Sequence, residues 1–333
     1  MEKYRVGIVG ATGMVGQRFI SLLKDHPWFE VNCVAASARS AGKTYREAVG
    51  ERWAFSWEIP EKVAGMTVVD AADIDEVSKH VDFVFCAVDM KKDEIRALEE
   101  AYAKHEIPVV SNNSACRGIE DVPMVVPEIN ADHLAVIEAQ KKRLGTKNGF
   151  IAVKPNCSIQ SYVPALTPLL DFEPEKVSVC TYQAISGAGK TFKTWPEMVD
   201  NVIPYIGGED EKSENEPLKL WGHVEDGKIV NATLPVISAQ CHMAAVSVSF
   251  KKKPTIEQIK ERWANYETEA QRLELPSAPK PFLQYFEDPS RPQTRLDRDF
   301  QNGFGVSIGR LREDKLFDYR FVCLSHNTVR GAA

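Results

Sequence analysis

The first half of the chain alternates short, nearly continuous apolar runs with segments whose apolar residues recur at helical spacing. The apolar runs cover residues 4–9, 31–36, 66–69, 81–88 and 107–110, and the helical segments cover 14–24, 93–104 and 130–143. Such an alternation is typical of a parallel sheet that helices cover on both faces. The pattern predicts an α/β domain of this kind over residues 1–155.

The pattern changes after Pro155. β-rich runs follow at 177–185, 229–237, 244–250, 304–311 and 316–324, and helical segments at 158–170, 191–203 and 255–269. Some runs alternate apolar and polar residues, as a strand with one covered face does. We predict an α+β second domain over residues 156–325, with a mixed, largely antiparallel sheet and loops at 206–217 and 276–300. Residues 326–333 are expected to return to the first domain.

The balance of charge limits the partners of this chain. Lysine and arginine total 41 and aspartate and glutamate total 47, which gives a net charge of −6. A mildly acidic protein is a poor candidate for binding nucleic acid or an anionic membrane through bulk charge. An anionic substrate must then be held by a local cluster of basic residues.

The cysteines indicate a reducing compartment. There are seven of them, and none forms a C-x-x-C motif. An odd number without that motif argues against a disulfide framework and against a zinc site. The chain enters a strand pattern soon after Met1, without a signal peptide, and no apolar run approaches membrane-spanning length. We expect a cytoplasmic protein without a bound metal.

A glycine-rich turn follows the first apolar run and opens the first helical segment. Its sequence, Gly10-Ala-Thr-Gly13-Met-Val-Gly16, is a variant of the dinucleotide-binding fingerprint. Glycines let the main chain approach a pyrophosphate, which the N–H groups and the dipole of the helix attract. Because a strand precedes the turn and a helix follows it, we interpret residues 1–155 as a Rossmann-type nucleotide domain.

The end of the second apolar run bears on the choice of cofactor. An acidic residue there would bind the ribose 2′-hydroxyl of NAD. The sequence at 36–40 is Ala-Ser-Ala-Arg-Ser instead. Arg39, Ser37 and Ser40 can hold a 2′-phosphate, and no carboxylate opposes them. This favours NADP over NAD.

Cys157 is the candidate nucleophile. It lies in the sequence Lys-Pro-Asn-Cys-Ser at 154–158, where a strand ends and an apolar helix begins. A helix N-terminus stabilises a thiolate, so this position should lower the pKa of the thiol and suit covalent catalysis. Taken alone, the position also fits a structural cysteine.

Several motifs follow one another along almost the whole chain. They are Gly-Ala-Thr-Gly-Met-Val-Gly at 10–16, Ser-Asn-Asn-Ser-Ala-Cys-Arg at 111–117, Pro-Asn-Cys-Ser at 155–158, Tyr-Gln-Ala-Ile-Ser-Gly-Ala-Gly at 182–189, Glu-Pro-Leu-Lys at 216–219 and Asn-Thr-Val-Arg at 327–330. In this order they resemble the aspartate-semialdehyde dehydrogenase family, in the branch shared by archaea and fungi. The resemblance implies an NADP-dependent enzyme of lysine, threonine and methionine biosynthesis. It would reduce L-aspartyl 4-phosphate to L-aspartate 4-semialdehyde, with release of phosphate, through a thioester on Cys157.

The resemblance also implies roles for individual side chains. Arg117 and Lys219 should bind the phosphate, and Glu216 should bind the substrate ammonium group. Gln183 should orient the substrate carboxylate or the acyl intermediate, and Asn156 should help to place the acyl oxygen. The second domain would be catalytic and would form a homodimer or homotetramer. Cofactor contacts are expected at Gly10, Thr12, Gly13, Met14, Val15, Gly16, Ser37, Arg39, Ser40, Cys86, Ser186, Gly187 and Asn327.

A general acid/base is needed to activate the thiol, and His242 is the best candidate among the seven histidines. The residues after it resemble those that follow the catalytic histidine of the family. The chain departs from the family directly before it, because Cys241 runs straight into His242. An arginine-containing segment, which would grip the substrate carboxylate, is absent there. A helix that relatives continue beyond residue 330 is also absent.

Two alternatives stay open at this point. The first is a reductase of another acyl donor, such as N-acetylglutamyl phosphate or malonyl-CoA. Glu216 and the basic pair Arg117 and Lys219 favour a small amino-acid acyl phosphate over a CoA thioester. The second alternative, prompted by the absent arginine, is a relative that binds NADP without catalysis.

Overall fold

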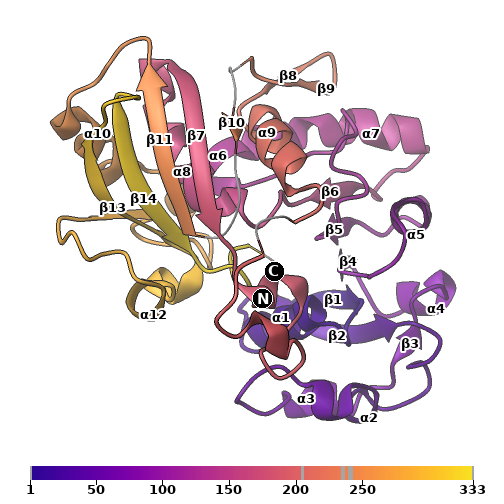
Figure 1. Cartoon of the computed structure of the whole chain (residues 1–333). Coiled ribbons are helices and arrows are strands. Elements are labelled where there is room, and N and C mark those ends of the chain that lie inside the picture. The colour runs from indigo at the N-terminus through magenta and orange to yellow at the C-terminus, as the bar shows by residue number, and fades with distance from the viewer. Residues whose placement is uncertain (1, 204–205, 234–236, 239–242, 332–333) are drawn as a thin grey trace.

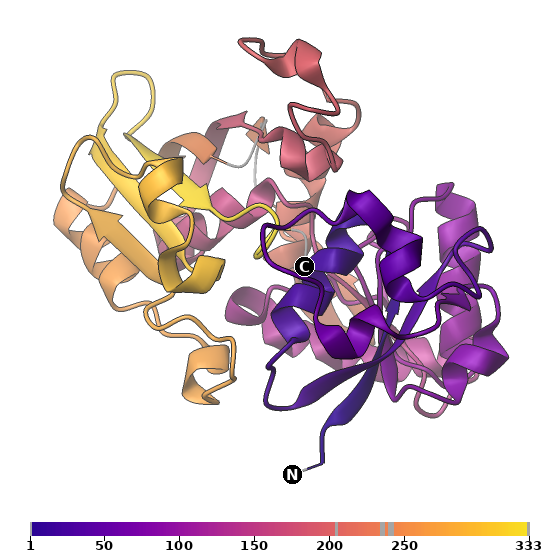
Figure 2. The ribbon, with the colours of Figure 1, turned by 90° about the horizontal axis from the view of Figure 1, so that it is seen from below.

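The computed structural model describes residues 2–203, 206–233, 237–238 and 243–331, with only the main chain for 237 and 238. Two units lie side by side, and each is built on a six-stranded sheet (Figure 1). Seen from below, the N-terminal strands and helices form one unit and most of the C-terminal half forms the other (Figure 2). The described C-terminal end lies between the two units.

The first unit confirms the predicted parallel sheet. Its strands run in the order β3-β2-β1-β4-β5-β6, and all neighbours are parallel. In such open sheets a ligand binds beyond the carboxyl ends of the strands, at the point where the order reverses, here between β1 and β4. The strands are β1 (Tyr4–Val9), β2 (Phe29–Ala36), β3 (Val69–Asp70), β4 (Phe83–Cys86), β5 (Val109–Ser111) and β6 (Ile151–Val153).

Helices cover both faces of this sheet because its central strands present apolar side chains on both. On one face Ile8 shares an apolar cluster with Phe19 of α1 and Tyr45 of α2. On the other face Val84 shares a cluster with Tyr102 of α5. The helices of this unit are α1 (Met14–Leu23), α2 (Tyr45–Val49), α3 (Glu61–Ala64), α4 (Ile74–Ser78), α5 (Lys92–Lys104), α6 (Pro127–Asn130) and α7 (Ile137–Leu144), with 3-10 turns η1 (Gly50–Arg52) and η2 (Ala131–Val136).

The second unit contains the predicted mixed sheet. Its order is β10-β7-β11-β14-β13-β12, in which the three central pairs are antiparallel and the two outer pairs parallel. These strands are β7 (Pro174–Tyr182), β10 (Ile237–Ser238), β11 (Met243–Phe250), β12 (Leu283–Phe286), β13 (Val306–Glu313) and β14 (Tyr319–Ser325). A separate hairpin consists of β8 (His223–Glu225) and β9 (Lys228–Val230).

Only one face of the mixed sheet is covered. Along β7, Val177 and Val179 are buried, whereas Cys180 and Tyr182 are exposed on the other face. The buried face packs against α8 and α10, and the alternation along β7 and β11 follows from this asymmetry. The helices of this unit are α8 (Ile159–Leu166), α9 (Glu209–Leu220), α10 (Ile256–Ala264), α11 (Glu269–Arg272) and α12 (Thr294–Asp297), with 3-10 turns η3 (Thr167–Phe172), η4 (Ile185–Ala188) and η5 (Pro196–Met198).

Several predicted elements are wrong in detail. The helix predicted at 191–203 is absent, and the segment holds only the short turn η5. The loop predicted at 206–217 contains most of helix α9, and the loop at 276–300 contains β12 and α12. The helices predicted at 130–143, 158–170 and 255–269 are interrupted or end in 3-10 turns. The run at 229–237 is divided between β9 and β10.

Among the described residues, no helix is both long enough and apolar enough to cross a membrane. In the same part of the chain, no group of three or more His, Cys, Asp or Glu side chains is arranged to hold a metal ion.

Candidate active site

The glycine-rich turn lies beyond the carboxyl end of β1 and leads into α1. Gly10 has φ of +90°, and a Cβ there would collide with the carbonyl group of Ala87, just after β4. A Cβ on Gly16 would lie 2.7 Å from Cα of Ala11. No acidic residue occupies the first turn of α1. The turn therefore offers bare main chain and an unopposed helix N-terminus, which fit the pyrophosphate of a dinucleotide. The other expected contacts in the turn are all at least partly exposed: Thr12, Gly13, Met14 and Val15.

The candidate 2′-phosphate site lies at the same edge of the sheet. A turn follows β2, in which the N–H of Ser40 donates to the carbonyl group of Ser37 over 2.8 Å. Ser37 and Arg39 are exposed there. Because β2 neighbours β1, this turn lies beside the glycine-rich turn. Cys86, the last residue of β4, is 1% exposed and belongs to the apolar core, so only its main chain can meet a cofactor.

Cys157 lies in the turn between β6 and α8. Both elements are fully buried, which anchors the turn at each end. The side-chain oxygen of Asn156 accepts hydrogen bonds from the main-chain N–H of Ser158 at 2.8 Å and from its hydroxyl at 2.6 Å. These contacts form an Asx turn directly before α8. Cys157 itself is half-buried.

The thiol of Cys157 does not have the lowered pKa that its helix-start position suggested. Burial raises the pKa above its ordinary value, and the carboxylate of Glu209 adds to the rise. The charges of Lys154 and Arg117 oppose it without reversing it. The sequence-based expectation was wrong in direction, because it counted the helix dipole and left out the cost of placing a thiolate in a buried turn.

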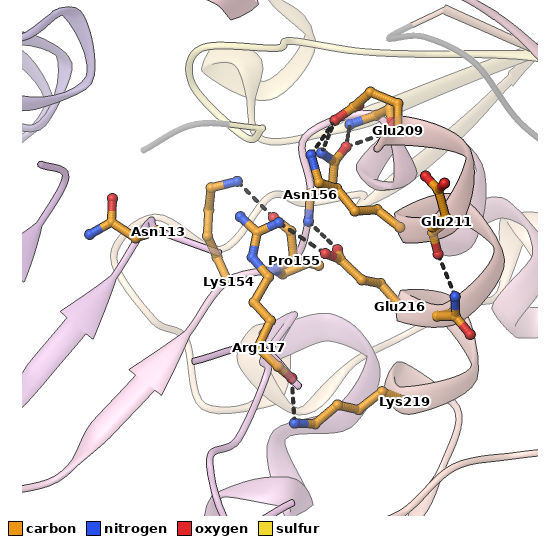
Figure 3. A network of polar contacts seen from close by, with 12 residues as sticks. Asn113, Arg117, Lys154, Pro155, Asn156, Glu209, Glu211, Glu216 and Lys219 are labelled. Carbon is orange, nitrogen blue, oxygen red and sulfur yellow. Dashed lines mark hydrogen bonds and ion pairs between the residues drawn. The ribbon is translucent and has the colours of Figure 1, made fainter. Parts of the chain in front are cut away.

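Glu209, at the start of α9, is a functional candidate that the sequence analysis missed. Its carboxylate is 6% exposed. It accepts hydrogen bonds from the amide groups of Asn156 at 3.0 Å and Gln183 at 3.1 Å, and from the ammonium group of Lys212 at 2.7 Å. Figure 3 shows Glu209 and Asn156 pointing toward each other. Although burial alone would raise it, these three donors together hold the pKa of Glu209 below its usual value.

Arg117, Glu216 and Lys219 form a second network beside the first (Figure 3). Arg117 donates to Glu216 over 2.9 Å, and both side chains are about one-tenth exposed. The other carboxylate oxygen of Glu216 accepts from the main-chain N–H of Asn156. Two residues expected to bind opposite ends of a substrate thus contact each other here.

Lys219 is held by main-chain carbonyl groups. Its ammonium group donates to the carbonyl oxygens of Arg117 and Ile119 at 2.7 Å each and of Val122 at 2.9 Å. An ammonium group has three N–H donors, so this arrangement engages all of them. Burial lowers the pKa of Lys219 to about 8.

A cavity of about 910 Å³ opens beside these two networks. Its lining contains Arg117, Glu216 and Lys219 together with the half-buried Lys212. The sequence analysis required a local cluster of basic side chains in an acidic protein, and this cavity has five basic residues beside three acidic ones, Glu120, Glu211 and Glu216. The basic residues of its lining are Lys92, Arg117, Lys212, Lys219 and Lys228.

Residues 326–331 connect the two units at the site. Asn327 donates to the hydroxyl of Ser186 over 2.7 Å, which brings together two of the residues expected on the nicotinamide side. The carbonyl group of Gly331 accepts from Lys154, and a Cβ on Gly331 would lie 2.9 Å from Cβ of Cys157. Gly187 is exposed in η4, next to Ser186. The segment therefore lies directly against the candidate nucleophile.

Two protein-family models together match most of the chain. The semialdehyde dehydrogenase NAD binding domain matches residues 5–137, and the semialdehyde dehydrogenase dimerisation domain matches residues 166–330. Aspartate-semialdehyde dehydrogenase from Archaeoglobus fulgidus is 42% identical over 99% of this chain and 95% of that protein. The enzyme from Aspergillus fumigatus is 42% identical over 99% and 94%. The chain belongs to the aspartate-semialdehyde dehydrogenase family.

A solved structure agrees with this assignment. The crystal structure of aspartate semialdehyde dehydrogenase with NADP from Candida albicans has a TM-score of 0.88 and 36% identity, and it covers 99% of this chain and 95% of that chain. Both the resemblance and the fold expected from the sequence are thereby confirmed.

The structure brings together most of the residues that the sequence singled out in this family member. Asn156 and Gln183 meet at Glu209, directly beside Cys157. His242 lies outside the described residues. Glu209 and Lys212 were missed because they lie in a charged stretch that the sequence analysis took for a loop. Lys154, which opposes the raised pKa of Cys157, stands in the same motif three residues before the thiol, but the sequence analysis gave it no role.

Proposed function

We propose that this chain is an NADP-dependent aspartate-semialdehyde dehydrogenase, which reduces L-aspartyl 4-phosphate to L-aspartate 4-semialdehyde and releases phosphate. The main support is the position of Cys157. It lies half-buried between two anchored elements, directly after Asn156, whose amide shares the carboxylate of Glu209 with Gln183. The main-chain N–H of Asn156 also donates to Glu216, which lines a cavity together with basic side chains. Proteins with this activity in their names are 42% identical over nearly their full length.

In the proposed reaction the Cys157 thiolate attacks the acyl carbon of the substrate. A carbon–sulfur bond forms, the bond from the acyl carbon to the phosphate oxygen breaks, and inorganic phosphate leaves. The glycine-rich turn would hold the pyrophosphate of NADPH and Ser37, Arg39 and Ser40 its 2′-phosphate, and the bound cofactor would supply the hydride that reduces the thioester. The carbon–sulfur bond then breaks, which releases the aldehyde and restores the thiolate. His242 is the proposed acid/base.

The ion pair between Arg117 and Glu216 matches a substrate that has both a phosphate and an ammonium group. In this proposal each substrate group replaces one partner of the pair, so that Arg117 gains the phosphate and Glu216 the ammonium group. Lys219 contributes its charge to the phosphate site while its carbonyl contacts hold it. N-acetylglutamyl phosphate has no ammonium group and would leave the buried Glu216 without a cation, which argues against that alternative.

We propose further that the chain acts in the cytoplasm as a homodimer or homotetramer. The match of residues 166–330 to a dimerisation domain supports assembly through the second unit. The uncovered face of its mixed sheet, on which Cys180 and Tyr182 are exposed, is the surface available for a second copy.

The test is phosphate-dependent reduction of NADP by the purified chain with L-aspartate 4-semialdehyde, beside the Cys157→Ala variant. Turnover by the parent and none by the variant supports the proposal. Equal rates would exclude the thioester mechanism. N-acetylglutamate semialdehyde and malonate semialdehyde with CoA are run in parallel, and faster turnover of either would redirect the substrate assignment. NADP binding without any turnover would show a non-catalytic relative.

A further inference from the structure

We propose that Glu209 is a positioning residue that holds the side chains of Asn156 and Gln183 at the site of Cys157. This inference rests on the proposed function, since its role concerns the same thioester. It assigns to the first turn of α9 a task in aligning the acyl group. The family models and relatives describe domains and whole enzymes and say nothing of this residue.

The geometry around Glu209 supports the inference first. One carboxylate oxygen accepts from the amide nitrogen of Asn156, and the other accepts from the amide nitrogen of Gln183. The two amide side chains come from separate elements, one before α8 and the other just after β7. A single buried carboxylate therefore joins the segment that carries the nucleophile to the segment that follows β7.

The chemistry of the groups then fixes how the amides are oriented. An ionised carboxylate only accepts hydrogen bonds, so each amide must turn its nitrogen toward Glu209 and its oxygen away. The oxygen of Asn156 is used at the start of α8, where Ser158 donates to it twice. The oxygen of Gln183 is directed away from Glu209. Without the carboxylate, the amide of Gln183 would lose this constraint, and the amide of Asn156 would keep only the contacts of its oxygen with Ser158.

The charge of Glu209 has a cost for the nucleophile, which makes its role testable. Glu209 is among the groups that raise the pKa of Cys157, whereas Lys154 and Arg117 lower it. A residue selected only to activate the thiol would have the opposite sign. If Glu209 positions the amides, removing its charge should ionise the thiol more easily and still slow turnover.

A purely structural role is the competing explanation, because Glu209 also lies in the first turn of α9, where an acidic residue stabilises the helix dipole. Asp210 occupies the same turn and makes the same contribution to the dipole. Asp210→Asn is therefore the matched control for Glu209→Gln, because both changes remove one charge and preserve the shape of the side chain.

The experiment measures two properties of the parent, Glu209→Gln and Asp210→Asn. The first is steady-state turnover of L-aspartate 4-semialdehyde with phosphate and NADP. The second is the pH dependence of alkylation by iodoacetamide, followed on the Cys157 peptide because Cys180 is exposed too. For Glu209→Gln we expect kcat to fall about 10- to 100-fold, since small displacements of positioned groups cost that much. The alkylation profile should move to lower pH, and Asp210→Asn should match the parent in both.

A double-mutant cycle with Gln183→Ala adds a readout that general destabilisation would not produce. If Glu209 acts through Gln183, the combined loss of kcat is smaller than the product of the two single losses. An unchanged kcat in Glu209→Gln overturns the inference. A lower rate of Cys157 alkylation together with a lower kcat overturns it as well, and so does a combined loss of kcat equal to the product of the two single losses. A parent without turnover refutes the proposed function, and the positioning role with it. An active parent beside an unaffected variant refutes the positioning role alone.

Discussion

Removing one partner of the buried ion pair between Arg330 and Glu128 should be among the most destabilising single changes in this chain. The two terminal guanidinium nitrogens of Arg330 donate to Glu128, at 2.9 and 3.0 Å. The side chains are 6% and 7% exposed. Arg330 also donates to the carbonyl group of Phe304 at 3.0 Å, and its guanidinium lies 4.5 Å from the ring centroid of Phe282. The pair joins the C-terminal segment to α6 of the first unit.

Replacing Arg330 with methionine removes the cation and leaves the buried carboxylate of Glu128 behind. Breaking one side of a buried, bidentate pair costs about 3–5 kcal/mol, because the remaining charge has neither water nor a partner. With a urea dependence of about 3 kcal/mol per M, the midpoint of unfolding should fall by about 1–2 M. Replacing both residues, as Arg330→Met with Glu128→Leu, should recover most of this loss, because neither charge then stays buried.

Urea unfolding followed by tryptophan fluorescence measures these differences. Arg298→Ala is the matched control, since Arg298 also forms an ion pair but is 59% exposed, and it should change stability by less than about 0.5 kcal/mol. A loss below about 1 kcal/mol in Arg330→Met would refute the reasoning, since that is the range of exposed pairs. A double variant less stable than Arg330→Met would refute it as well.

Three further outcomes are expected. Lys154→Met should shift alkylation of Cys157 to higher pH, because the Lys154 charge opposes the raised pKa of the thiol; an unchanged profile would contradict this. Gly16→Ala should weaken NADP binding at least tenfold, or by about 1.4 kcal/mol, because its Cβ would lie 2.7 Å from Cα of Ala11. Fluorescence titration measures this affinity, and Gly65→Ala, which has open space around it, should bind NADP as the parent does. Glu99 is fully buried and accepts hydrogen bonds from Ser111 and Asn113, which anchors the 111–117 loop. Glu99→Ala should therefore raise KM for phosphate and lower the free energy of unfolding by about 1–3 kcal/mol. Equal KM in parent and variant would exclude a role for this anchor.

The parallel-sheet unit could be predicted from sequence because its strands are buried on both faces. A continuous apolar run such as that of β1, when helices alternate with it, indicates a strand of a parallel sheet that is covered on both faces. The glycine-rich turn was predictable for a related reason. Gly10 and Gly16 occupy positions where any side chain would collide with main chain, so the sequence there directly reports the geometry.

The segment 191–203 shows where apolar periodicity misleads. Phe192, Val199 and Val202 recur at helical intervals, and the sequence analysis predicted a helix over residues 191–203. In the structure all three are exposed, and Val202 is 84% exposed. No face of the segment meets the core, and Pro196 interrupts it. Apolar spacing predicts a helix only where the apolar face has something to pack against.

Helix α9 shows the converse error, and it explains why part of the site was missed. Residues 206–217, which hold most of α9, are so rich in glycine, proline and charge that they were assigned to a loop. Yet Glu209, Ser213 and Glu216 are buried, at the spacing i, i+4, i+7 of one helix face. This face packs against a polar network, so the residues that recur at helical spacing on it are polar or charged and not apolar. Where a helix faces a substrate cavity, the pattern to search for is therefore periodic charge, and the same pattern names the residues that act there.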